Sequence, residues 1–240
     1  MMVLVTLFLL QMLKKNYMEI YMENHQKNKY RYERKYILSP INLPGFLYEL
    51  NSKDYIEIYT ERTINNLYLD SCDLSSVQDN INGLSNRKKY RIRWYGPSFS
   101  KSKKQFEIKK KSEFLNSKSI TLLGDYKVDG LKDIERFFFE ITESLEQNNV
   151  YINNSLKHLF PSLFNSYERR YFLSKDQKIR ITIDSFLNFY SPITTNKFEE
   201  NNLIVEAKYS KDTIRIDSFK HLNLCKYSKY VKGVLSTSTY

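Results

Sequence analysis

Alanine is nearly absent from this chain of 240 residues, in which Ala207 is the sole one. Six glycines and five prolines are also few, which excludes a collagen-like chain or one dominated by linkers. The two cysteines, Cys72 and Cys225, lie far apart and neither belongs to a C-x-x-C pair. No disulfide framework or zinc site is therefore expected, and the usage fits a reducing compartment. The three histidines are scattered and are expected on the surface.

Long apolar runs are missing too. The one strongly apolar stretch covers residues 1–13, against roughly 20 residues needed to span a bilayer. It lacks a basic start and a small-x-small cleavage site, so it is a poor signal peptide. We interpret residues 1–25 in one of two ways. Either the start codon was assigned too early and translation begins at Met18 or Met22, or these residues form a loose N-terminal helix. Residues 26–240 are expected to form a single domain. A cytoplasmic location is favoured, with membrane contact through residues 1–13 as the alternative.

Familiar nucleotide and hydrolase motifs are absent. The sequence contains no G-x-x-x-x-G-K-[ST], G-x-G-x-x-G, G-x-S-x-G or H-E-x-x-H. Nucleotide handling by this chain would therefore not rest on a P-loop.

Positive charge is abundant. Lysine and arginine number 38 against 27 aspartates and glutamates, a formal net charge of +11. The chain is also 41% hydrophobic and 15% aromatic, which excludes a disordered chain. A folded protein with this balance is expected to meet a polyanionic partner.

Short runs with strand character recur between turn residues, and two stretches have helical spacing. Strands are predicted at residues 30–38, 64–70, 90–95, 105–111, 167–173, 178–186 and 203–209, and helices at 43–50 and 131–145. Asn82-Gly83 marks a turn after the second strand, and the third and fourth strands are predicted to form a hairpin around Gly96-Pro97. The fold class is therefore predicted as α+β with a mostly antiparallel sheet.

Charges occupy alternate positions of these strands. Side chains two residues apart share one face of a strand, so Arg91 and Arg93 lie opposite Ile92 and Trp94. The same alternation gives charged faces in four further strands, at Glu107, Lys109 and Lys111, at Arg180 and Asp184, at Glu206 and Lys208, and at Glu33 and Lys35. A single such strand is typical of a sheet with one face in water, but five of them suggest a shared function.

A closed sheet with helices outside would turn these charged faces into an interior. Burying an unpaired cation costs several kcal/mol, so such an interior would hold water and an anion. Arginine and lysine suit phosphoryl oxygens, and the few carboxylates suit Mg²⁺ or Mn²⁺. Cations, carboxylates and a metal ion together are the groups that enzymes use to catalyse phosphoryl transfer.

Eight short motifs, in order, resemble the VTC (vacuolar transporter chaperone) domain. They are Arg31-Tyr-Glu-Arg-Lys35, Tyr68-Leu-Asp70, Arg91-Ile-Arg-Trp-Tyr-Gly96, Phe106-Glu-Ile-Lys109, Tyr167-Glu-Arg169, Arg180-Ile-Thr-Ile-Asp184, Val205-Glu-Ala-Lys208 and Tyr227-Ser-Lys229. The similarity covers about residues 30–232. The family belongs to the triphosphate tunnel metalloenzymes, which implies an antiparallel β-barrel tunnel with helices packed on the outside.

The resemblance implies a polyphosphate polymerase-like phosphotransferase. Its partners would be ATP and polyphosphate or triphosphate, and its cofactor Mn²⁺ or Mg²⁺. Catalytic residues carried over by motif are Arg91, Arg93, Lys109, Arg169 and Arg180. Phosphate-binding residues would be Lys35, Lys118, Lys208 and Lys229, and the metal ligands Glu206 first and Glu107 next.

One departure from the family concerns Lys118, which is followed by Ser119 where a second basic residue is usual. Two alternatives also stay open. The first is a tripolyphosphate or nucleoside triphosphate hydrolase of the same fold. The second is a non-catalytic binder of polyphosphate or nucleic acid, of which nucleic acid is disfavoured because Tyr90 and Trp94 lie opposite Arg91 and Arg93. Product length and oligomeric state are left open.

Overall fold

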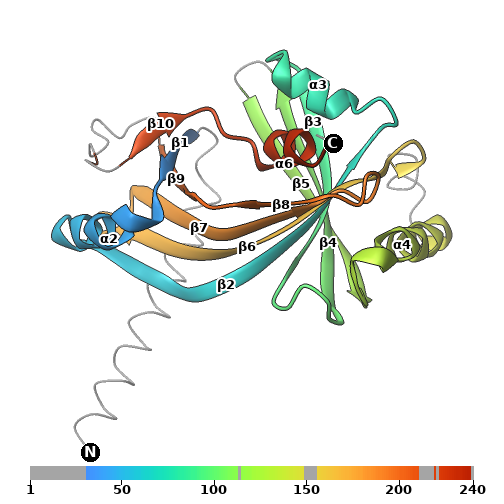
Figure 1. Cartoon of the computed structure of the whole chain (residues 1–240), viewed down its shortest axis with the longest axis horizontal. Coiled ribbons are helices and arrows are strands. Elements are labelled where there is room, and N and C mark those ends of the chain that lie inside the picture. Colours follow the sequence, from blue (N-terminus) through green and yellow to red (C-terminus); the bar gives the residue numbers. More distant parts are fainter. Residues whose placement is uncertain (1–30, 113–114, 149–155, 211–218, 220–221, 239–240) are drawn as a thin grey trace, which may run out of the picture. The chain divides into compact units, whose positions relative to one another are not determined.

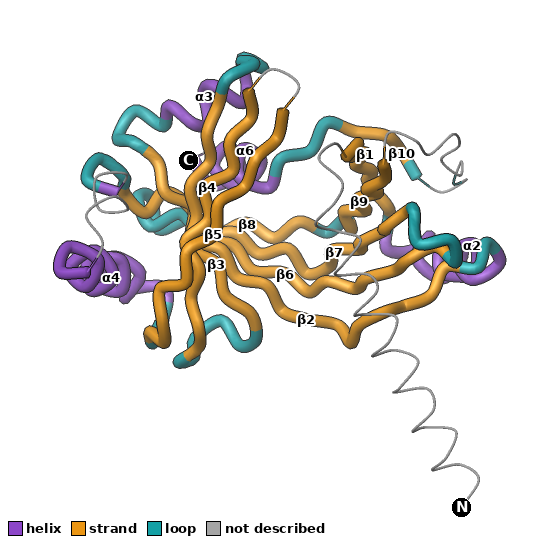
Figure 2. The backbone as a smooth tube through the Cα atoms, turned by 180° about the vertical axis from the view of Figure 1, so that it is seen from behind, coloured by secondary structure: helices purple, strands orange, loops and turns teal. Residues whose placement is uncertain are grey.

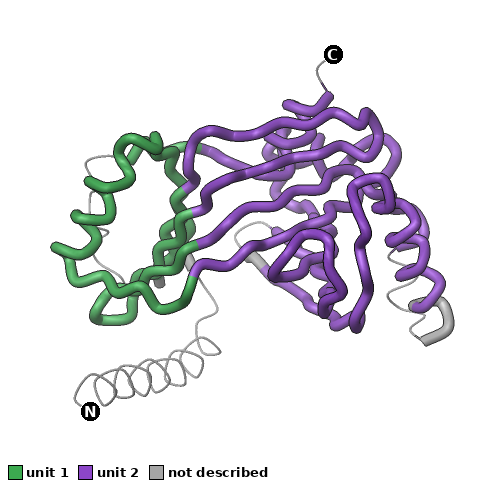
Figure 3. Tube along the Cα trace, turned by 60° about the horizontal axis from the view of Figure 1, so that its bottom comes forward, with its two compact units in different colours: residues 1–60, 170–183, 205–225 green, residues 61–169, 184–204, 226–240 purple. Residues whose placement is uncertain are grey.

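The computed structural model describes residues 31–112, 115–148, 156–210, 219 and 222–238. The predicted N-terminal segment, residues 1–25, lies outside these ranges. The chain forms two compact units, each made of separate stretches of sequence (Figure 3). Unit 1 comprises residues 1–60, 170–183 and 205–225, and unit 2 comprises residues 61–169, 184–204 and 226–240.

A sheet of ten strands carries the fold, in the order β10-β1-β9-β7-β6-β2-β3-β4-β5, with β8 paired to β7 (Figure 1). The strands are β1 (Arg31–Leu38), β2 (Tyr55–Asp70), β3 (Arg87–Tyr95), β4 (Ser102–Ser112), β5 (Leu115–Tyr126), β6 (Phe160–Ser174), β7 (Ile179–Tyr190), β8 (Lys197–Glu200), β9 (Leu203–Ser210) and β10 (Asn223–Cys225). The pairs β1/β10, β2/β3, β3/β4, β4/β5 and β7/β8 are antiparallel.

The predicted α+β class with a mostly antiparallel sheet is confirmed. All seven predicted strands are present, although β2 and β6 begin nine and seven residues earlier than expected. The strand order has two ends, β10 and β5, so within the described residues the sheet is not closed into a barrel by strand pairing.

Both predicted helices are present as α2 (Leu43–Ser52) and α4 (Ile134–Asn148), the latter preceded by a 3-10 turn, η2 (Leu131–Asp133). The structure adds η1 (Pro40–Asn42), α3 (Ser75–Ile81) and α6 (Lys229–Ser238), which the sequence pattern did not indicate. Among the described residues, no helix is both long and apolar enough to cross a membrane.

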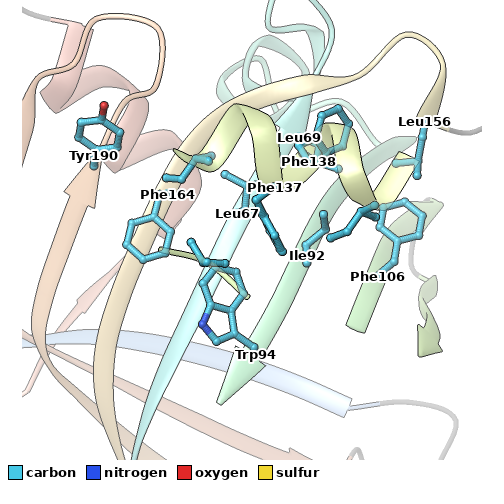
Figure 4. Close-up of a cluster of buried hydrophobic side chains, with 13 residues drawn as sticks. Leu67, Leu69, Ile92, Trp94, Phe106, Phe137, Phe138, Leu156, Phe164 and Tyr190 are labelled. Atoms are coloured by element: carbon cyan, nitrogen blue, oxygen red, sulfur yellow. The ribbon is translucent and has the colours of Figure 1, made fainter. Parts of the chain in front are cut away.

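The core of unit 2 lies between α4 and one face of β2, β3 and β4 (Figure 4). Ile134, Phe137 and Ile141 recur on the inner side of α4 at helical spacing and are almost fully buried. Ile92 and Trp94 of β3 are fully buried in the same cluster. Their burial confirms the alternation predicted for β3, because Arg91 and Arg93 then project from the opposite face.

The opposite face of this part of the sheet receives α6. The ring of Tyr230 stacks on that of Tyr68, with centroids 4.6 Å apart. Gly233 lies so close to the sheet that a Cβ built there would be 2.4 Å from Leu163 and 2.5 Å from Phe189. Besides α4 on the apolar face, unit 2 therefore carries a helix on the face of the arginines.

Unit 1 has a smaller core around α2. Phe46 and Leu50 of this helix are buried, and the Phe46 ring lies 5.3 Å from that of Phe219 in an edge-on arrangement. The alternation predicted for β7 and β9 holds here, since Ile181 and Val205 are fully buried. Lys208, on the other face of β9, keeps 36% of its side chain exposed.

Candidate functional site

Four charged residues of β3, β4 and β5 form one cluster in unit 2, here called the arginine cluster: Arg91, Arg93, Glu107 and Lys118. The strands lie side by side (Figure 2), with Arg91 directly across from Glu107. Arg91 donates through Nε to one oxygen of Glu107 at 2.6 Å, and its Nη2 lies 2.5 Å from the same oxygen as an ion pair. Lys118 Nζ lies 2.6 Å from the other oxygen, as an ion pair rather than an aligned hydrogen bond.

Arg93 is held by neutral groups as well as by charge. Its Nη1 lies 3.9 Å from Glu107, and its Nε donates to the side-chain oxygen of Asn66 at 2.8 Å. The Asn66 amide in turn donates to Asn165 at 2.9 Å. Arg93 is only 8% exposed, so its guanidinium is fixed in direction before any ligand arrives.

A second charged group in unit 2 is centred on Asp184 of β7, here called the Asp184 group: Asp184, Arg169 and Lys229. Arg169 of β6 donates to both carboxylate oxygens, at 2.5 and 2.7 Å. Lys229, the first residue of α6, donates to one of them at 2.5 Å. Asp184 is fully buried, so it anchors two cations from different elements in one place.

Tyr167 of β6 connects the two groups. Arg93 Nη2 lies 3.5 Å from its hydroxyl oxygen. The Arg169 guanidinium and the Lys229 amine lie 5.3 and 4.8 Å from its ring centre, as cation–π contacts. The arginine cluster and the Asp184 group are therefore parts of one site, here called the unit 2 site.

The acids of this site stay ionised despite their burial. Burial alone would raise the pKa of Glu107, but Arg91, Arg93 and Lys118 outweigh it and lower this pKa to about 2. Burial likewise opposes ionisation of Asp184, and Arg169 and Lys229 lower its pKa below the usual range.

Three other members of the site also have shifted pKa values. Burial disfavours the charged form of Arg91, yet Tyr68 and Glu107 raise its pKa. Burial would raise the pKa of Tyr167, but Arg169 and Arg93 lower it. Burial lowers the pKa of Lys118 although Glu107 opposes the change.

Positive charge exceeds negative charge in the unit 2 site. Five cations, contributed by both groups, meet two carboxylates, an excess of three positive charges. Buried cations repel one another strongly at these separations unless an anion is added. Arginine forks and lysine amines match phosphoryl oxygens in particular. The arrangement is suited to binding a phosphate polymer or a triphosphate.

Like charges also face one another across the ends of β3, β4 and β5. The ladder register sets Lys89 opposite Lys109, Lys109 opposite Lys118, and Arg87 opposite Lys111. Directly opposed like charges destabilise a sheet. Lys109, predicted as catalytic, thus lies in a basic row next to the arginine cluster, and Lys89 donates to Ser228 at 3.0 Å.

The remaining predicted residues lie in unit 1. Lys208 is 2.5 Å and Lys35 4.0 Å from the carboxylate of Glu206, and Lys35 is 3.1 Å from Glu33. Two lysines thus meet two carboxylates in a balanced group. Arg180, also in unit 1, lies with its guanidinium 5.3 Å from the ring centre of Tyr171.

The two predicted metal ligands differ in their surroundings. Glu107 is 1% exposed and engaged by three cations, which would repel a divalent ion, so it does not fit a metal ligand. Glu206 also meets cations, Lys208 and Lys35, but Lys35 is shared with a second carboxylate, Glu33. Glu206 therefore fits better the mode in which Mg²⁺ is held by one or two carboxylates plus substrate phosphates. The described residues contain no group of three or more His, Cys, Asp or Glu that could hold a metal by itself.

Sequence reasoning missed Asp184 and Tyr167 as members of the site. Both belong to motifs used for the resemblance, and the alternation in β7 places Asp184 on the charged face. Its role as the shared anchor of Arg169 and Lys229 depends on contacts between segments 15 and 45 residues apart. No local pattern carries that information.

The profile of the VTC domain matches residues 15–238, nearly the whole chain, and this chain belongs to the VTC domain family. No curated protein matches it. Two solved structures are similar over most of their length. One is a candidate adenylate cyclase from Vibrio parahaemolyticus, with a TM-score of 0.42 and 11% identity over 78% of this chain and 80% of that one. The other is a candidate adenylyl cyclase from Hippeastrum, described as having a dominant triphosphatase activity, with a TM-score of 0.42 and 11% identity over 75% and 79%.

Proposed function

We propose that this chain is a metal-dependent phosphotransferase of the polyphosphate polymerase kind, with ATP as donor and a growing polyphosphate chain as acceptor. Membership of the VTC domain family supports the reaction class. The observation that carries the proposal is the excess of positive charge in the unit 2 site, fixed in position by two buried carboxylates. Preorganised cations of this kind neutralise the charge that develops on a transferring phosphoryl group.

The roles of the residues follow from their contacts. Arg91 and Arg93 would bind the phosphates of the nucleotide, because Glu107 and Asn66 fix their guanidinium planes. Arg169 and Lys229 would hold the acceptor phosphates next to them, with Asp184 as their common anchor. An oxygen of the acceptor's terminal phosphate forms the new bond to the γ-phosphorus as the bond to ADP breaks.

A Mn²⁺ or Mg²⁺ ion, when bound, would supply further neutralisation of phosphate charge. Glu206 is the proposed protein ligand, and Lys35 and Lys208 would orient it. Glu206→Gln is expected to lose metal-dependent turnover while keeping the fold. The exposed Glu199→Gln is the control, and near-normal turnover in Glu206→Gln would contradict the assignment.

The proposed reaction is tested by incubating the purified chain with ATP and Mn²⁺ and separating the products on a gel. Long-chain polyphosphate is the expected product. Arg91→Ala combined with Arg93→Ala should abolish it, whereas Lys132→Ala in η2 combined with Arg136→Ala in α4, both exposed, should not. Orthophosphate alone would instead indicate a hydrolase.

If the purified chain turned over no ATP, the remaining candidate function would be non-catalytic binding of polyphosphate or nucleic acid. A nucleic-acid platform is disfavoured by the site itself. Tyr68 and Tyr167 share the face of the arginines but are 6% and 3% exposed, so their rings are not open to stacking bases.

A further inference from the structure

Glu107 lies where a bound phosphate would be expected. One oxygen of its carboxylate meets Nε and Nη2 of Arg91, the other lies beside the Lys118 amine, and Arg93 is at 3.9 Å. Three cations around one carboxylate reproduce the surroundings that arginine and lysine give to a phosphoryl group. Since Glu107 is 1% exposed, this anion is a permanent part of the fold.

The contacts leave part of Arg91 available. A guanidinium carries five N–H groups, and Glu107 engages the edge formed by Nε and Nη2. The outer edge, with Nη1, is not used by Glu107. A phosphate oxygen can bind there without displacing the carboxylate, but it then lies close to a second negative charge.

We propose that Glu107 is an internal counter-ion that positions Arg91 and lowers the affinity of the arginine cluster for phosphate, and that it is not a metal ligand. This inference rests on the proposed function for the identity of the ligand. Glu107 keeps the cations together in the free protein and offsets part of their attraction for the product. An enzyme that must release or advance a polyanion gains from this lowered affinity, because tight binding of the ground state does not accelerate the reaction.

The two roles of Glu107 are separated by measuring Glu107→Gln both in metal-free buffer and with Mn²⁺. As a counter-ion, its neutralisation adds one positive charge to the cluster and tightens binding of tripolyphosphate about tenfold. As a metal ligand, its neutralisation would also raise the Mn²⁺ concentration needed for half-maximal turnover. We expect the first result, with no change in the Mn²⁺ requirement.

Glu57→Gln is a matched control. Glu57 also makes a bidentate pair with an arginine, Arg170, at 2.9 and 2.8 Å, but this pair belongs to unit 1. The substitution removes the same formal charge elsewhere, so it corrects for the general increase in net charge. Its metal-free affinity for tripolyphosphate should stay within about twofold of the wild type, because Glu57 is paired with Arg170 outside the arginine cluster and is partly open to screening by solvent.

A double variant keeps the test decisive if Glu107→Gln folds poorly. Lys118→Met alone removes one cation and should weaken tripolyphosphate binding about tenfold. Lys118→Met with Glu107→Gln restores the net charge of the arginine cluster, so its affinity should return to near the wild-type value. A double variant as weak as Lys118→Met alone would overturn the proposal.

A readout independent of the reaction separates this inference from the proposed function. Without metal or nucleotide, sulfate should raise the melting temperature of Glu107→Gln more than that of the wild type or Glu57→Gln. Equal rises in all three proteins would overturn the counter-ion role. Failure of the proposed function would appear differently, as a wild-type protein without product from ATP.

Discussion

Lys104 of β4 is a lysine buried in the core of unit 2. Its side chain is fully buried, and its Nζ lies 4.9 Å from the ring centre of Trp94. It donates to Ser102 Oγ at 2.8 Å and to the Ser100 carbonyl at 3.2 Å, which ties the β3–β4 connection to the core. Burial lowers the pKa of Lys104 to about 8, although Asp125 opposes the change.

This lowered pKa predicts a pH dependence of stability. Between about pH 8 and the ordinary lysine pKa, the unfolded chain binds more protons than the folded one, so the free energy of unfolding rises with pH. At about 1.4 kcal/mol per pKa unit, the gain is about 2–3 kcal/mol. Lys104→Met should lose this dependence, as measured by denaturant unfolding from pH 7 to 10.

Lys103→Met is the control for this measurement, because Lys103 is the exposed neighbour in the same strand. It should follow the wild-type pH profile. Tyrosines that titrate at the upper end affect all three proteins alike and cancel in the comparison. A constant difference between wild type and Lys104→Met across this range would contradict the assignment.

At the residue scale, the sequence predicted which side chains carry charge on one face, but not how they pair. Arg91 and Glu107 were both placed on the charged face, and strand register then brings them together. Glu107 was predicted to bind metal, whereas its surroundings suit a counter-ion. The distinction depends on Lys118, whose pairing with Glu107 requires the position of β5.

At the scale of single elements, α6 depends on its close fit to the sheet. Gly233→Ala would place a Cβ within 2.5 Å of Leu163 and Phe189 side-chain atoms. The cost of such overpacking is typically about 1–3 kcal/mol and exceeds the gain of about 1 kcal/mol from replacing a helical glycine. We expect a lower melting temperature, and weaker tripolyphosphate binding because Lys229 begins this helix.

Gly130→Ala is the matched control for the α6 prediction. A Cβ added to Gly130 would lie 3.7 Å from its nearest neighbour, Oδ2 of Asp133, and the backbone there is extended. The added methyl group therefore has room. Its melting temperature and affinity should equal those of the wild type. A Gly233→Ala protein that matches it in both properties would show that the fit of α6 is not needed.

The elements that sequence patterns missed have identifiable causes. In α6, a glycine and several serines and threonines lower the helix propensity, and packing of Tyr230 and Gly233 supplies the stability instead. In β5, Lys118, Ile120 and Leu122 share one face, so the strand lacks the separation of charged and apolar faces that revealed the other strands. Ile120 and Leu122 are accordingly exposed, at 52% and 72%.

At the scale of the whole molecule, the excess of cations predicts that anions stabilise the fold. A tight-binding phosphate at about 100 times its dissociation constant adds about 2.7 kcal/mol to the free energy of unfolding. For a chain of this size, that is a rise of several degrees in melting temperature. Tripolyphosphate should raise it more than sulfate at equal ionic strength, because a linear chain reaches both the arginine cluster and the Asp184 group.

Arg91→Ala combined with Arg93→Ala should reduce this difference between tripolyphosphate and sulfate, measured by thermal unfolding. The pair Lys132→Ala and Arg136→Ala removes the same charge from η2 and α4 and should not reduce the difference. If tripolyphosphate and sulfate raise the wild-type melting temperature equally, the cations act as ordinary surface charges.

The placement of Trp94 gives the molecule a built-in optical probe. It is the sole tryptophan of the chain and lies in the core of unit 2, against Phe137 and Phe164. Its emission therefore follows the melting of unit 2, whereas far-ultraviolet circular dichroism follows the strands of both units. Strands β2, β6, β7 and β9 each contain residues of both units, so the backbone couples the unfolding of unit 1 to that of unit 2. The tryptophan emission and the circular dichroism signal should therefore change together, in one cooperative transition.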